Sequence, residues 1–114
     1  MIINGVELQD LDIYDIEVAE KFDKGLKSVA EVGENLEGLS MPETIKVQCN
    51  AIFKFFNEFF GEGTDKKIFG GKVNLVTCLK ALDEFVSQVR SQRERIEEIS
   101  NKYSPNRAAR RNKK

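Results

Sequence analysis

The chain has 114 residues, of which 40% are hydrophobic and 32% are charged, and its formal net charge is −1. This length suits one small domain, and this composition is typical of a soluble globular protein. The absence of histidine excludes imidazole-based acid–base catalysis and most zinc sites. No segment approaches the roughly 18 uninterrupted apolar residues that a membrane-spanning helix requires.

The first ten residues, MIINGVELQD, contain neither the basic region nor the apolar region of a secretory signal. We therefore expect a cytoplasmic protein. In that compartment Cys49 and Cys78 are best interpreted as reduced, buried thiols, and their separation matches no zinc-binding spacing. We expect no metal and no cofactor.

The charges are separated along the chain. Residues 1–40 carry ten carboxylates and three lysines, a balance of −7, whereas residues 104–114 carry five basic residues and no acid. Like charges in sequence repel one another and resist compaction. We therefore predict a single helical domain over residues 1–103 and a basic disordered tail over residues 104–114. The charged residues of this basic arm are Arg107, Arg110, Arg111, Lys113 and Lys114.

The first predicted element is a short β-hairpin at the N-terminus. Apolar, mainly β-branched residues flank Asn4-Gly5, a dipeptide that tolerates positive φ at both turn positions, and the second strand should reach about Leu11. Two strands alone are marginally stable. The hairpin must therefore lie on a helix or pair with another chain.

Two helices should follow. Helical spacing of apolar residues predicts the first from about Asp12 to Gly38. Its apolar face should comprise Ile16, Ala19, Phe22, Leu26, Val29, Gly33 and Leu36. The sequence from Ser40 to Glu43 fits a capping box with proline in the first turn, which predicts the second helix from Met41 to about Phe60.

Residues 61–73 contain four glycines and should form a loop, in which Thr64 could cap a single turn. The last helix is the longest, from Asn74 to about residue 102, roughly 43 Å at 1.5 Å per residue. Its apolar stripe should comprise Leu75, Leu79, Leu82, Val86 and Val89, the spacing of a heptad seam. This helix should project beyond a body of this mass. The predicted fold is mainly α, with a hairpin followed by three helices.

No motif indicates catalysis. Gly70-Gly71-Lys72 resembles part of a phosphate-binding loop, but it lacks the earlier glycine and is followed by Val73 instead of serine or threonine. The serines have no histidine to activate them and no nucleophile-elbow context. We expect a protein that is not an enzyme.

The phenylalanines are concentrated in the chain, since six of the eight fall between residues 53 and 69. They can form the core of the domain or a surface for a partner. Because a chain this small has few elements to cover them, we predict an exposed surface at Phe53, Phe55 and Phe59 that binds a client or a second copy. The predicted partner-binding residues are Phe53, Phe55, Phe56, Phe59 and Phe60.

The two ends of the chain together resemble one family. The sequence Ser104-Pro-Asn-Arg-Ala-Ala-Arg-Arg111 is similar to the Asn-Arg-Ala-x-Arg-Arg tail of tail assembly chaperones in long-tailed phages of Gram-positive hosts. The opening Ile3-Asn-Gly-Val6 looks like the short hairpin that precedes their acidic helical body.

The resemblance implies a role and partners. Such chaperones bind the long, aggregation-prone helical tape measure protein until the tail tube protein displaces them, and they often self-associate. It therefore implies a non-catalytic chaperone, a helical client and a homo-oligomer.

A small nucleic-acid-binding regulator that uses the basic arm is the alternative function. The acidic body would repel phosphate, and the arm has no aromatic residues to stack on bases. Both features argue against nucleic acid as the partner.

Overall fold

The computed structural model describes residues 1–103, so the predicted basic tail lies outside the described residues. The elements in chain order are β1 (Ile2–Ile3), β2 (Val6–Glu7), α1 (Ile16–Glu34), α2 (Met41–Phe60), α3 (Thr64–Phe69) and α4 (Leu75–Lys102). The prediction of a mainly α fold, with an N-terminal hairpin and a long last helix, is confirmed.

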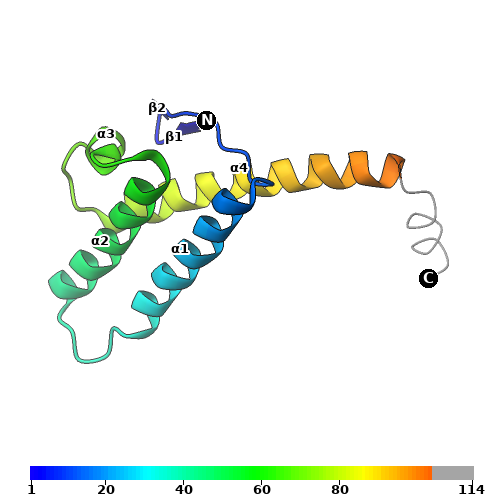
Figure 1. The fold of residues 1–114 in the computed structure, drawn as a ribbon. Helices are drawn as coiled ribbons and strands as arrows, with labels where there is room; N and C mark the ends of the chain where they lie inside the picture. The colour runs from blue at the N-terminus through cyan, green and yellow to red at the C-terminus, as the bar shows by residue number, and fades with distance from the viewer. Residues whose placement is uncertain (104–114) are drawn as a thin grey trace.

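The helices form a compact body from which one end of α4 extends. Figure 1 shows α1 and α2 as an antiparallel pair that α4 crosses, with the orange half of α4 reaching past the other elements. The molecule measures 54 × 32 × 22 Å. Within residues 1–103, no helix is both long enough and apolar enough to cross a membrane.

The hairpin forms as predicted at Asn4-Gly5, where both residues have positive φ. It packs on the helices of its own chain, because Ile3 is fully buried. Hydrogen bonds fix its position: the Asn4 amide donates to Glu84 Oε1 at 2.8 Å, and the Gln88 side chain donates to the Ile2 carbonyl at 2.8 Å. The strands end at Glu7, earlier than the predicted Leu11.

The first helix is shorter at both ends than predicted. Asp12 belongs to a turn that precedes α1, and Asp15 is the N-cap, its carboxylate accepting from the Glu17 amide at 3.0 Å. The helix ends at Glu34 because the Asn35 side chain donates to the Glu31 carbonyl at 2.7 Å. Residues 36–40 then connect α1 to α2.

The predicted bounds of α2 are confirmed, and so is its capping box, in which the Glu43 amide donates to Ser40 Oγ at 3.3 Å. The prediction of a loop over residues 61–73 is wrong in part, since residues 64–69 form α3. Two features of the sequence favour this helix. Asn57 of α2 accepts from the Asp65 amide at 2.9 Å, and the buried side chain of Ile68 anchors the segment to the core.

The predicted apolar stripe of α4 is shifted around the helix. Leu79, which was expected in the seam, is 46% exposed, whereas Cys78, Ala81 and Phe85 are buried. Leu75 and Leu82 lie at the border of the buried face and are half-buried. The buried face is therefore centred on Phe85, whose ring fills the space between α1 and α2.

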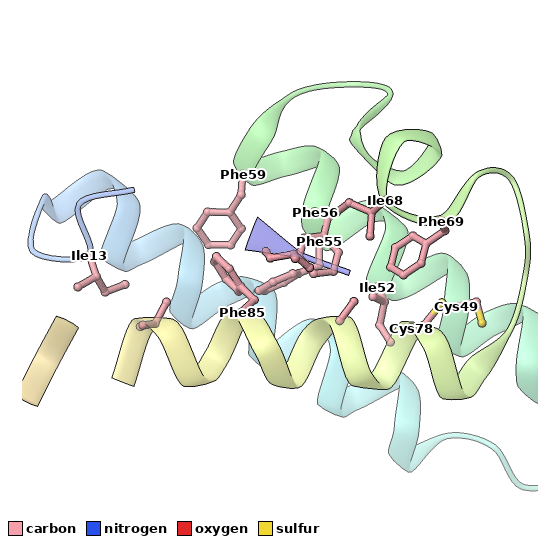
Figure 2. Packing of buried hydrophobic residues seen from close by; sticks show 13 residues of the cluster. Ile13, Cys49, Ile52, Phe55, Phe56, Phe59, Ile68, Phe69, Cys78 and Phe85 are labelled. Atoms are coloured by element: carbon pink, nitrogen blue, oxygen red, sulfur yellow. The ribbon is translucent and has the colours of Figure 1, made fainter. Parts of the chain in front are cut away.

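The two cysteines are free thiols and fully buried, as predicted, Cys49 on α2 and Cys78 on α4 (Figure 2). Burial raises the pKa of the Cys78 thiol to about 12, and its hydrogen bond with Cys49 adds to the shift. An unfolded thiol ionises near pH 9, whereas the folded one stays neutral up to about pH 12. The contribution of this thiol to stability is therefore fully present below pH 9 and is lost as the pH rises towards 12.

Close approach of α1 to α2 requires glycine at one position. A Cβ added at Gly25 would lie 2.6 Å from Cδ2 and 2.7 Å from Cε2 of Phe55, a buried ring that would have to shift to admit it. At Gly33 the nearest atom would be Nε2 of Gln48, at 3.8 Å. The same helix thus contains one glycine that packing requires and one that it does not.

We expect Gly25→Ala to lower the free energy of unfolding by about 1–3 kcal/mol, because the strain of overpacking exceeds the gain in helix propensity. Gly33→Ala, the matched control, should raise it by up to about 1 kcal/mol. Urea denaturation followed by circular dichroism measures both. Stabilisation by both substitutions would contradict the close packing of α1 on Phe55.

We also expect both thiols of the native protein to react slowly with Ellman's reagent at pH 8, because both are buried where the reagent cannot reach them. For Cys78, the raised pKa also makes the reactive thiolate rarer than in the unfolded chain. Both thiols should react at once in denaturing urea. Immediate reaction of a thiol in the native protein would contradict their burial.

Candidate interaction site

The predicted phenylalanine surface is not exposed. Phe55, Phe56 and Phe59 are 2%, 0% and 8% exposed and belong to the hydrophobic core. Phe53 and Phe60 are half-buried and pack against that core. The expectation of an exposed apolar surface at Phe53, Phe55 and Phe59, which would bind a client or a second copy, is therefore wrong.

Three other elements cover these rings. Phe85 of α4 lies among them, with ring centroids 5.5 Å from Phe55 and 5.2 Å from Phe59 (Figure 2). Phe22 of α1 closes the side next to Phe59, at 6.3 Å. On α3, Phe69 stands 5.1 Å from Phe53. The sequence analysis expected residues 64–69 to be part of a loop, and it therefore counted too few elements that could cover these rings.

One exposed apolar surface lies on the far half of α4, and Val76 and Leu79 are also exposed near the other end of this helix. We call residues 93–103 the overhang, since residues 93–99 are all exposed and project from the body (Figure 1). Ile96, Ile99 and Tyr103, which we call the exposed seam, are 37%, 49% and 74% exposed. Their spacing of three and four residues places them on one face of the helix.

The exposed seam continues the buried face of α4 without a change of phase. From Phe85 and Val89, which are 0% and 3% exposed, the same spacing leads through the half-buried Gln92 to Ile96. Up to Val89 the body covers this face, Ile96 still borders a hollow that Tyr14 of the body also lines, and Ile99 and Tyr103 lie beyond that hollow. Ile99 and Tyr103 are in register with Phe85, a relation that the leucine-based stripe of the sequence analysis missed.

Two hollows lie where the overhang leaves the body, and Tyr14, which is 51% exposed, lines both of them. One, of about 310 Å³, also includes Phe22 and Arg93 in its walls. The other, of about 380 Å³, is formed by the segment that precedes α1 together with Arg95 and Ile96. The root of the overhang therefore offers one largely apolar recess and one whose walls are mainly polar and charged.

Electrostatically, the segment before α1 is acidic. The α-amino group of Met1, 2.7 Å from Asp10 Oδ1, lowers the pKa of that carboxyl through a hydrogen bond and its positive charge. This contact between Met1 and Asp10 is the only ion pair that the structure records among residues 1–103. Asp10 and Asp12 both line the second hollow. Arg95 of the overhang lines this same hollow, and Arg93 lines the first hollow together with Asp23.

The part of the chain that the structure describes contains no group of three or more histidine, cysteine or acidic residues that could hold a metal ion. Its buried cysteines lie on the contact between α2 and α4, away from both hollows. The predicted basic arm, from Arg107 to Lys114, lies outside the described residues.

Residues 4–114 match the model of a family of unknown function, DUF6673, and the chain belongs to that family. Neither a curated protein nor a solved structure matches the chain. The family description gives no activity, so an argument about function depends on the geometry described above and on the sequence resemblance.

We expect Phe55→Ser to unfold the protein, since truncation of a buried phenylalanine costs about 3–5 kcal/mol, a large part of the stability of a small domain. Tyr14→Ser, which alters an exposed ring, should change the free energy of unfolding by about 0.5 kcal/mol or less. Thermal unfolding followed by circular dichroism compares the two variants. If the Phe55→Ser protein stays folded but associates less strongly, Phe55 lies at the surface and the expectation is wrong.

Proposed function

We propose that this protein is a non-catalytic phage tail assembly chaperone, which binds the helical tape measure protein in the host cytoplasm and keeps it soluble until the tail tube assembles. The proposal combines the tail motif between Asn106 and Arg111 with a surface suited to a helical client. It requires neither a cofactor nor a metal.

The observation that carries the proposal is the exposed seam of α4. An isolated amphipathic helix with an uncovered apolar face gains stability when a second helix packs on that face. Ile96, Ile99 and Tyr103 supply such a face on a helix that extends clear of the body. A long helical client can lie along this face, with the hollows that Tyr14 lines at one end of the contact.

The charge of α1 supports a solubilising role. Its exposed side bears several carboxylates, among them Glu17, Glu20 and Asp23. A chaperone that covers apolar surface must itself stay in solution, and exposed acidic residues are effective in that role. The same carboxylates argue against the alternative of a nucleic-acid-binding regulator, because they would repel phosphate.

A co-expression experiment tests the proposal. The client to use is the long helical protein encoded next to this one, and the measured quantity is its soluble fraction. We expect the wild-type protein to raise that fraction, and Ile99→Asp to reduce the gain about tenfold, because a buried carboxylate opposes helix packing.

Leu79→Asp is the matched control. Leu79 is 46% exposed and Ile99 is 49% exposed, both on α4, but Leu79 lies off the seam. Leu79→Asp should leave the soluble fraction of the client as high as the wild-type protein does. The proposal fails if no long helical protein is encoded nearby, if the client is equally soluble alone, or if both substitutions act alike. Steeply salt-dependent binding to nucleic acid, with no effect on the client, would favour the alternative.

A further inference from the structure

The residues that flank the exposed seam are basic. With 100° of rotation per residue, Arg93 falls on one side of the seam and Arg95 and Lys102 fall on the other. The carboxylates of the overhang, Glu94, Glu97 and Glu98, lie towards the opposite face. The overhang thus has an apolar stripe with positive borders and a negative back.

These positive borders share their hollows with carboxylates of the body, Arg93 with Asp23 and Arg95 with Asp10 and Asp12, but form no ion pair with them. Within residues 1–103, the structure pairs neither Arg93 nor Arg95 with a carboxylate, and both side chains are exposed. The ammonium group of Lys102 lies 5.8 Å from the centre of the Tyr103 ring, a contact that leaves it at the surface. In a two-helix coiled coil, the residues beside the apolar seam determine which partner is accepted.

A second copy of this chain is a poor occupant of the seam. When the overhangs of two copies pair, the two bodies lie at opposite ends of the pair only if the two helices run antiparallel. In that arrangement, like flanking positions face each other, so Arg95 of one copy would approach Lys102 of the other. Like charges in these positions select against the pairing.

We propose that the overhang forms a two-helix coiled coil, along the exposed seam from Ile96 to Tyr103, with an amphipathic helix whose apolar stripe is flanked by acidic residues. Acidic flanks would pair with Arg93, Arg95 and Lys102, while the largely apolar hollow that Phe22 lines would receive an apolar side chain at the end of the seam. This inference shares its surface with the proposed function and specifies the chemistry of the client.

Two synthetic peptides test the proposal on the full-length protein. Both have the same length and leucine at every seam position, and they carry either glutamate or lysine at every flanking position. Fluorescence anisotropy at low salt should show that the glutamate peptide binds at least about tenfold more tightly. The difference should shrink as salt rises, because these charges are exposed.

Charge reversal provides the decisive variant. Arg93→Glu combined with Arg95→Glu should reverse the preference, so that the lysine peptide binds more tightly. Lys80→Glu combined with Arg90→Glu makes the same change in net charge at exposed positions away from the seam. This control should preserve the preference of the wild type. Circular dichroism verifies that both variants remain folded.

Four results would overturn the inference. They are equal affinity for the two peptides, an unchanged preference after the reversal at Arg93 and Arg95, an equal effect of the control variant, and a dimer in sedimentation equilibrium that Ile99→Asp dissociates. The last result would assign the seam to a second copy. Since the peptides are not the natural client, binding of the glutamate peptide without any effect on client solubility would refute the proposed function and leave this inference standing.

Discussion

The packing of one ring, Phe85, determines the shape of this molecule. Its centroid lies between 5.2 and 5.9 Å from those of five other phenylalanines, one on α1 and four on α2. Aromatic pairs at these separations add to the stability gained from burial. Phe85 stands near the middle of α4, so the contact that fixes this helix to the body leaves its C-terminal part without support. The overhang is a direct result of where that ring lies in the sequence.

Local signals predicted the elements whose cause is itself local. The Asn4-Gly5 turn and the Ser40 capping box each depend on residues within a few positions, and both appear where expected. The late start of α1 also has a local cause, the Asp15 cap, but several acidic residues before it compete for that role. Sequence alone could not choose among them.

Non-local packing explains what the sequence did not reveal. Whether Phe55 faces a partner or the core depends on how closely α1 approaches α2, and Gly25 decides this from thirty residues away. Similarly, α4 offers two adjacent apolar stripes, and periodicity gives no reason to prefer the one that contains Phe85. The candidate site was misplaced for the same reason, because the exposed seam is recognisable only once its register with Phe85 is known.

The hairpin has a consequence for the order in which this chain can fold during synthesis. Asn4 is held by Glu84 and by the carbonyl of Ile68, and Ile2 is held by Gln88, so the hairpin must wait for residues that are synthesised 64 to 86 positions later. The rings of α2 likewise lack their main cover until Phe85 has been synthesised. Contacts between distant parts of a chain form slowly, and uncovered apolar surface invites aggregation in the meantime. On the ribosome, therefore, the phenylalanine rings of α2 stay uncovered for a time, until Phe85 has been added to the chain and can pack on them.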